Sequence, residues 1–113
     1  MPTILITPFV RAEVCAALHQ QVFQKRVSLA QANSAWLDFE QDGDNGTLTR
    51  IDFPLAALNL TVDIAKRFAP TLGVRTLDSM HVACALELGA QKFWTFDDRQ
   101  ARLAQAVGLD TSS

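Results

Sequence analysis

The sequence predicts an α/β fold with a short parallel sheet. Short apolar runs suited to strands alternate with longer segments whose apolar residues recur every three to four positions, as on one face of a helix. Strands separated by helices are typical of parallel sheets. With 113 residues, 49% of them hydrophobic and 19% charged, the chain fits a single globular domain over residues 1–113.

The chain begins with a predicted strand and a predicted helix. Residues 3–6 (TILI) form the apolar run of the strand. Pro8 suits the first position of a helix because its missing N–H would have no partner there, and Thr7 is then the expected N-cap. The apolar spacing predicts that this helix continues to about Lys25 and buries one face.

A second helix, a second strand and a third helix follow. Ser28 is the expected N-cap of the second helix, which should stop at the turn-forming residues 41–46 (QDGDNG). The alternation in residues 48–53 predicts a short strand. Pro54 introduces the third helix, which we expect to end near Ala69, just before the next proline.

The last part of the chain predicts a buried helix, a strand and a closing helix. Thr76 is the expected N-cap of a helix over residues 77–90, which is apolar on every side and should therefore be buried between layers. Gly89 should stop this helix. Residues 92–96 (KFWTF) have the pattern of a buried strand, and residues 97–108 form an amphipathic pattern closed by a glycine.

Charge and cysteine usage narrow the function classes. The net charge of −2 gives no general attraction to a nucleic-acid backbone, so such binding would depend on local basic residues, here Arg75, Lys92, Arg99 and Arg102. The first residues lack the basic region of a signal peptide, and no apolar run approaches a membrane span. Cys15 and Cys84 are expected to be free, buried thiols, as in a cytoplasmic protein.

Three acidic residues stand among apolar neighbours. Asp78 lies in the first turn of the buried helix, Asp97 at the end of the last strand, and Glu13 beside the apolar face of the first helix. Simpler explanations exist for each: the helix dipole for Asp78, and an exposed ion pair with Arg11 or another base for Glu13. Asp97 would serve as an N-cap, a role that Asp98 could fill equally well.

Taken together, the three carboxylates predict a divalent-metal site. The carboxyl ends of parallel strands, where the following helices begin, are the usual ligand-binding edge of an α/β sheet. Mg²⁺ and Mn²⁺ prefer the hard oxygen ligands that carboxylates supply. Such a site could activate water and stabilise the charge of a phosphate during hydrolysis.

The order of these segments resembles that of a PIN domain, particularly those of VapC-like toxins from toxin–antitoxin pairs. The resemblance rests on the stretches TPFVRAEVCAAL, RTLDSMHVACALELGA and KFWTFDDR. It implies a PIN-like three-layer α/β/α domain and a metal-dependent endoribonuclease, with Glu13, Asp78 and Asp97 as catalytic residues and as ligands of Mg²⁺ or Mn²⁺. It also implies RNA as the substrate and an antitoxin protein as a partner.

Three further residues are the expected substrate contacts. Thr95 should share the face of Asp97, because side chains alternate along a strand. Arg75 and Arg99 flank the two aspartates in sequence and would bind RNA phosphates. His81, one turn after Asp78, is expected to be a hydrogen-bonded core residue and not a catalytic one.

The chain departs from the family pattern at its N-terminus. Family members open with a strand that ends in an aspartate, and no counterpart is present, so we expect an N-terminally truncated sheet. Unpaired strand edges are costly, so the flanking strands should pair directly or a second subunit should close the gap in a homodimer. Three hypotheses remain: an active ribonuclease, a catalytically impaired interaction module on the same scaffold, or a translation start that lies further upstream.

Overall fold

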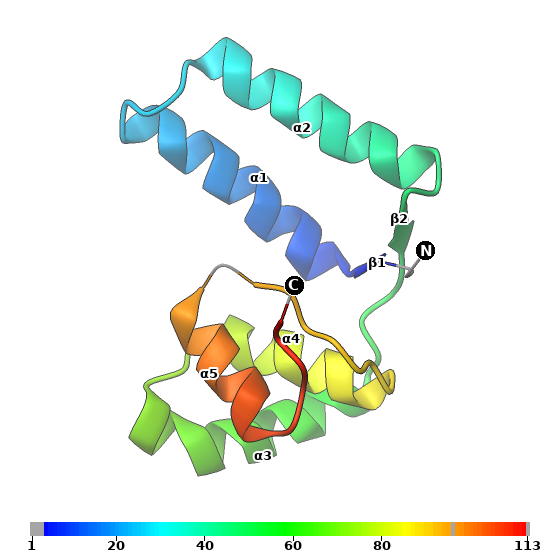
Figure 1. Ribbon diagram of the computed structural model, residues 1–113, viewed down its shortest axis with the longest axis vertical. Coiled ribbons are helices and arrows are strands. Elements are labelled where there is room, and N and C mark those ends of the chain that lie inside the picture. The colour runs from blue at the N-terminus through cyan, green and yellow to red at the C-terminus, as the bar shows by residue number, and fades with distance from the viewer. Residues whose placement is uncertain (1–3, 96, 113) are drawn as a thin grey trace. The chain divides into compact units, whose positions relative to one another are not determined.

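Figure 1 shows the computed structural model, which describes residues 4–95 and 97–112. The chain falls into two compact units, Met1–Phe53 and Pro54–Ser113, which are described in turn. The described residues form five helices and a two-stranded parallel sheet, so the predicted α/β class is confirmed. The three-layer stacking and the single domain over the whole chain stay predictions.

The first unit contains the sheet. Strands β1 (Ile4–Ile6) and β2 (Leu48–Arg50) pair in parallel, with Ile4 opposite Leu48 and Ile6 opposite Arg50. The pairing extends one residue further, because the Ile51 N–H donates to the Ile6 carbonyl at 2.9 Å. A parallel pair needs a long crossover, and here two helices provide it.

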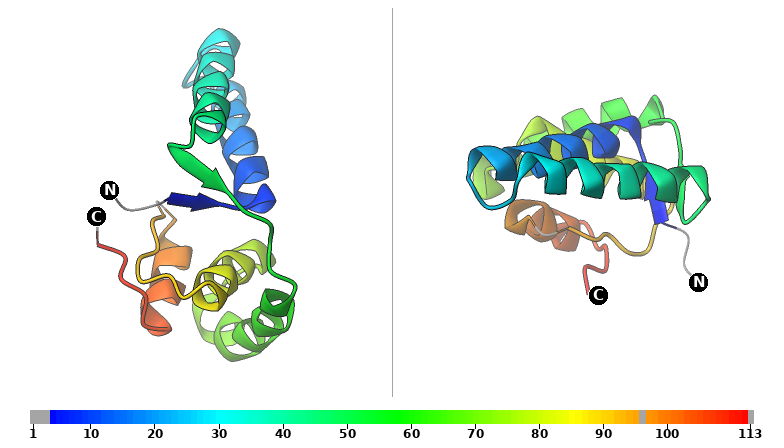
Figure 2. Two further views of the ribbon diagram at one scale, coloured as in Figure 1. Left: turned by 90° about the vertical axis from the view of Figure 1, so that its right-hand side faces the viewer. Right: turned by 90° about the horizontal axis from the view of Figure 1, so that it is seen from above.

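The two crossover helices form a hairpin (Figures 1 and 2). Helix α1 (Pro8–Phe23) begins as predicted, with the Thr7 hydroxyl accepting from the Val10 N–H at 3.2 Å. Helix α2 (Leu29–Asp44) opens with a capping box between Ser28 and Gln31. The prediction that the first helix buries one face is wrong: no residue of α1, all of which is described, is buried, and several are only partly buried.

Helix α2 continues beyond its predicted end. The turn-forming string starts inside the helix, and the chain turns only at Asn45 and Gly46. Gly43 explains part of this difference. A side chain there would meet the Arg50 guanidinium at 2.6–2.8 Å, so glycine gives Arg50 room to lie against the end of the helix. The glycine is present for close approach and not for a turn.

The second unit is helical. Helix α3 (Ala56–Leu72) passes through Pro70, against the prediction that it would end at Ala69. A proline in the last turn removes only one backbone hydrogen bond, and the helix ends three residues later at Gly73, which has a positive φ of 66°. α3 packs against α4 and α5, and these three helices lie together in the left view of Figure 2.

Helix α4 (Thr76–Glu87) is the buried helix that the sequence predicts. Every residue from position 78 to position 84 is buried, the polar ones included. The predicted cap is wrong, because Thr76 is the first helical residue and is exposed. Arg75 occupies the N-cap position, and its backbone N–H donates to Asp78 Oδ2 at 2.8 Å.

The expected strand over residues 92–96 is also wrong for the described residues 92–95. They form a single parallel bridge, Lys92 with Asp110, and Trp94 is 52% exposed, although we expected it in the core. Position 96 lies outside the described residues. Helix α5 (Asp98–Ala106) follows and closes near Gly108, which has a positive φ of 91°.

Two further expectations concern cysteines and membranes. Both cysteines are free; Cys84 is buried, as expected, whereas Cys15 is only partly buried. Burial raises the pKa of the Cys84 thiol, which keeps it protonated. Within residues 4–95 and 97–112, no helix is long and apolar enough to cross a membrane.

Candidate functional site

Asp78 is a carboxylate built into the start of a buried helix. Its residue is 6% exposed, and its Oδ2 accepts the Arg75 N–H, one of the donors that a helix N-terminus leaves without an internal partner. Arg75 has no acceptor in its side chain, so the carboxylate alone satisfies this part of the cap. The simpler explanation given above, attraction to the helix N-terminus, is therefore real for Asp78, and it leaves Oδ1 outside the cap.

Asp97 caps the next helix. Its Oδ1 accepts from the Arg99 N–H at 2.8 Å and from the Gln100 N–H at 3.1 Å. Asp98 does not take over this role, because it is already the first residue of α5. Both cap bonds fall on one oxygen of an exposed side chain, so Oδ2 is not needed for the cap.

Thr95 and Gln100 hold Asp97 in place. The Thr95 hydroxyl accepts from the Asp97 N–H at 3.0 Å and donates to Gln100 Oε1, also at 3.0 Å. Together with the Gln100 N–H bond to Asp97, these contacts close a ring of three residues. Gln100 is 9% exposed. Thr95 therefore contacts Asp97 through a local turn and not through the strand alternation that the sequence predicts, and its hydroxyl is already engaged by protein groups.

Gln100 is a residue that sequence reasoning missed. It stands three and four positions before Leu103 and Ala104, both of which are 0% exposed, and so it lies on the apolar stripe of α5. A polar side chain on that stripe needs a hydrogen-bond partner when it is buried. The position of Gln100 on this stripe was the feature of the sequence that could have predicted its burial and its hydrogen bonds.

Two carboxylates of the second unit have the chemistry of ligands for a divalent cation. Asp78 lies in the first turn of α4 and Asp97 is the N-cap residue of α5; these two helices pack against each other, and each aspartate has one carboxylate oxygen that its cap does not use. In the part of the chain that the structure describes, no three His, Cys, Asp or Glu side chains form a group that could hold a metal. Mg²⁺, however, is usually held by one or two carboxylates together with water and substrate phosphates.

For the remaining predicted site residues, the structure gives the position in the fold and the exposure. Glu13 lies in α1, in the first unit, and is partly buried. Arg75 and Arg99 of the second unit are exposed, as phosphate contacts should be. His81 is 7% exposed and belongs to the buried face of α4, in agreement with the core assignment.

The first unit contains an ion cluster that the sequence reasoning did not foresee. The Arg11 guanidinium donates to both oxygens of Glu40, at 2.6 and 3.2 Å, and lies over the Trp36 ring at 5.1 Å. Arg50 donates to the Glu40 carbonyl at 3.1 Å and to Asp44 at 2.8 Å. The hydrogen bond from Arg11 and its charge lower the pKa of the Glu40 carboxyl.

An α/β fold with aspartates at the starts of adjacent helices is compatible with a phosphate-cleaving enzyme that uses a divalent cation. The family model of the PIN domain matches residues 1–106, so the chain belongs to the PIN-domain family. Membership indicates a function of the nuclease type, and PIN domains generally depend on divalent metals. No curated protein and no solved structure shows a significant match.

Proposed function

We propose that this protein is a Mg²⁺- or Mn²⁺-dependent endoribonuclease in which Asp78 and Asp97 bind the cation. The observation that carries the proposal is the arrangement of the two carboxylates. Each uses one oxygen to cap its own helix and keeps the other for a ligand, and the family match supplies the reaction class. Glu13 is the third acidic residue that the family resemblance assigns to this chemistry.

The roles of the residues follow from their contacts. A bound divalent cation would supply stabilisation of phosphate charge and a lowered pKa of water. Asp78 would be held in place, since the residue is buried and its Oδ2 accepts the Arg75 N–H. The ring of Thr95 and Gln100 would fix the direction of Asp97. Arg75 and Arg99 would bind the phosphates of a single-stranded RNA.

Finer parts of the proposal come from the resemblance to VapC-like toxins. We include the toxin role in a toxin–antitoxin pair, a cognate antitoxin protein, a homodimer and a cytoplasmic location. A pulldown of the chain expressed with its genomic neighbour, followed by light scattering, tests the antitoxin and the dimer. A monomer that binds no neighbouring product would remove both.

A second candidate is a catalytically impaired PIN scaffold that serves as an interaction module. The observation that favours it is that both aspartates already have a structural role in capping helices, which is sufficient to explain their presence. The two candidates differ in one property, because only the enzyme needs carboxylate charge at these positions.

The test exploits that difference. Asparagine is as good an N-cap as aspartate, so Asp97→Asn should keep the helix and lose the ligand charge. We expect at least a hundredfold loss of Mn²⁺-dependent cleavage of single-stranded RNA, or about 2.7 kcal/mol of transition-state stabilisation. Asp78→Asn should behave in the same way.

Neighbouring acids provide matched controls. Asp98→Asn removes a charge one residue from Asp97, and Glu87→Gln removes an exposed charge at the end of α4. Both variants should cleave at the rate of the unmodified protein. If all four variants cleave RNA equally, or if the unmodified chain cleaves none, the interaction module is the better account.

A further inference from the structure

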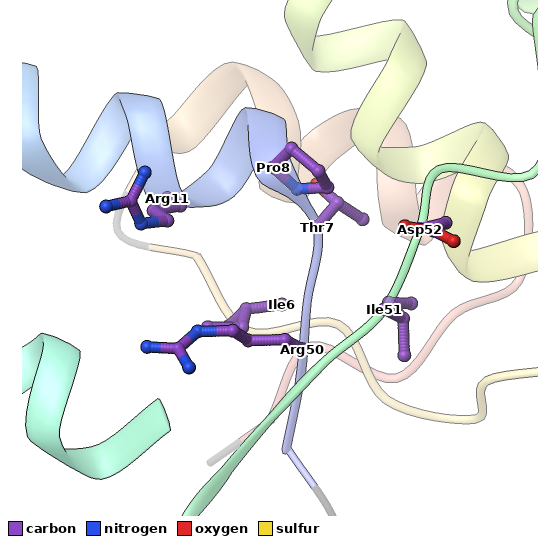
Figure 3. Close-up of a pocket in the computed structure, with 7 residues that line it drawn as sticks. All are labelled: Ile6, Thr7, Pro8, Arg11, Arg50, Ile51 and Asp52. Atoms are coloured by element: carbon purple, nitrogen blue, oxygen red, sulfur yellow. The ribbon is translucent and has the colours of Figure 1, made fainter. Parts of the chain in front are cut away.

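The parallel sheet of the first unit ends in a pocket. It has a volume of about 380 Å³ and lies at the carboxyl ends of β1 and β2, and it is lined by Ile6, Thr7, Pro8, Arg11, Arg50, Ile51 and Asp52 (Figure 3). This edge of a parallel sheet is where open α/β folds bind ligands. The volume lies near the lower limit of about 300–1,000 Å³ for small-molecule sites, which suits a single nucleotide.

The chemistry of the lining is divided between two sides. In Figure 3 the guanidinium groups of Arg11 and Arg50 lie on one side, and the carboxylate of Asp52 lies on the other. Thr7 and Pro8 bring the N-terminus of α1 to the pocket, which adds partial positive charge. Ile6 and Ile51 supply apolar surface beside these groups.

The two guanidinium groups are positioned but not used up. Each donates two hydrogen bonds to α2, to Glu40 from Arg11 and to Glu40 and Asp44 from Arg50. The side chains nevertheless remain 49% and 42% exposed. Since a guanidinium has five N–H donors, each of the two arginines can still donate hydrogen bonds to a bound anion. Gly43 keeps the space in which the Arg50 guanidinium is held.

We propose that this pocket binds one ribonucleotide unit of a single-stranded RNA, with Arg11 and Arg50 on a phosphate and Asp52 accepting a hydrogen bond from the ribose 2′-hydroxyl. Planar guanidinium groups bind phosphate through paired hydrogen bonds. The 2′-hydroxyl is the group by which a protein distinguishes RNA from DNA. The inference deepens the proposed ribonuclease function and rests on it for the choice of nucleic acid.

The experiment measures binding without catalysis. Fluorescence anisotropy of labelled oligo(U) and of oligo(dU) of the same length, with the full chain in EDTA, compares two strands that differ only in the 2′-hydroxyl. We expect tighter binding of the RNA, and Asp52→Ala should abolish that preference. Equal affinity of the unmodified protein for the two strands would overturn the proposal.

Two variants test the phosphate contact. Arg50→Ala should weaken RNA binding on the order of tenfold and lower the salt dependence by about 0.7 in the log–log slope, the value for one phosphate contact on a single strand. Arg26→Ala, which removes an exposed charge of the same unit outside the pocket, is the control and should change affinity little. If both variants weaken binding equally, the attraction is diffuse and the pocket is not the site.

Gly43→Ala separates binding from folding. The new methyl group would displace the flexible end of Arg50, while alanine favours a helix by about 1 kcal/mol over glycine. RNA affinity should therefore fall although thermal stability is kept or rises; unchanged affinity would count against the arginine contact. The binding assay in EDTA does not depend on cleavage. If the protein cleaves RNA but the pocket variants bind RNA as the unmodified protein does, the pocket proposal is refuted and the ribonuclease proposal is not.

Discussion

The two units of this chain are stabilised in different ways. In the second unit, seven consecutive residues of α4 are buried, and Leu103 and Ala104 of α5 are 0% exposed. In the first unit, α1 has no buried residue, α2 has only Ala32, and the helices are joined by exposed hydrogen bonds and ion pairs. Burial contributes far more stability than exposed ion pairs do. The proposed metal ligands Asp78 and Asp97 lie in the well-buried unit, and the proposed nucleotide pocket lies in the polar one.

The largest expected effect is the difference in stability between two Leu→Ala variants, one in each unit. Leu103→Ala removes a fully buried side chain and should lower the free energy of unfolding by about 2.7–5 kcal/mol. Leu37→Ala changes a side chain that is 67% exposed and should cost no more than about 0.5 kcal/mol. Urea denaturation followed by circular dichroism measures both. Similar losses in the two variants would show that the units do not differ in this way.

A smaller effect concerns the cap of α5. Asp97→Ala removes the acceptor of two backbone N–H groups and should cost about 1 kcal/mol, whereas Asp97→Asn should be nearly neutral. The same denaturation assay applies. If asparagine destabilised as much as alanine, the charge of Asp97 and not its cap geometry would stabilise the second unit, and the control used for catalysis would need replacement.

The sequence predicted some features of the two units correctly and others wrongly. The all-round apolar pattern of residues 77–90 correctly predicted the buried helix, because a helix that is apolar on every side has no face suited to water. The periodic spacing of the first helix did not predict burial correctly. Local turn signals were less reliable. Gly43 and Pro70 both lie inside helices, because Gly43 makes room for Arg50 and Pro70 falls in a last turn, where one lost bond is tolerated.

The site was predictable in part. The aspartates were singled out because carboxylates among apolar residues are unusual. The capping role of Asp97 was foreseen as an alternative, whereas for Asp78 only the attraction of the helix dipole was foreseen and the cap was assigned to Thr76.

The cluster of Arg11, Glu40 and Arg50 was not found, because its members are separated by 29 and by 10 positions and meet only when α1 packs against α2 and β2 returns beside α2. Charged residues at such distances carry no periodic signal. The strand expected near Trp94 was wrong because an apolar run alone does not distinguish a strand from an extended connection.

A pH-dependent effect should distinguish the polar unit. The pKa of Glu40 is lowered in the folded protein from the reference value of 4.5, mainly by the hydrogen bond from Arg11. A lowered pKa stabilises the folded state above the reference value, and this contribution is lost as the pH falls through the folded pKa below 4.5. Glu40→Gln should therefore flatten the stability profile on the acid side. An unchanged profile would show that the ion cluster adds nothing to the stability of the hairpin.

The smallest effect is expected at His19, which joins the two helices of the hairpin. Its ring contacts the Cys15 carbonyl at 2.8 Å and Asn33 Oδ1 at 3.1 Å, and the backbone contact is the main cause that raises its pKa above 6.5. A raised pKa stabilises the folded state below 6.5, and the contribution is lost as the pH rises through the folded value. Thermal melts from pH 6 upward should show a slight decline that His19→Gln removes; a decline that persists in the variant must arise from another group.

Calorimetric titration with Mn²⁺ tests the central claim most directly, that the aspartates of the second unit bind a cation in addition to capping their helices. We predict stoichiometric Mn²⁺ binding to the unmodified chain, loss of binding in Asp78→Asn and in Asp97→Asn, and unchanged binding in Asp98→Asn, with all four proteins equally folded by circular dichroism. Binding that survives in both asparagine variants, or no binding to the unmodified chain, would contradict this account and leave the two carboxylates as helix caps.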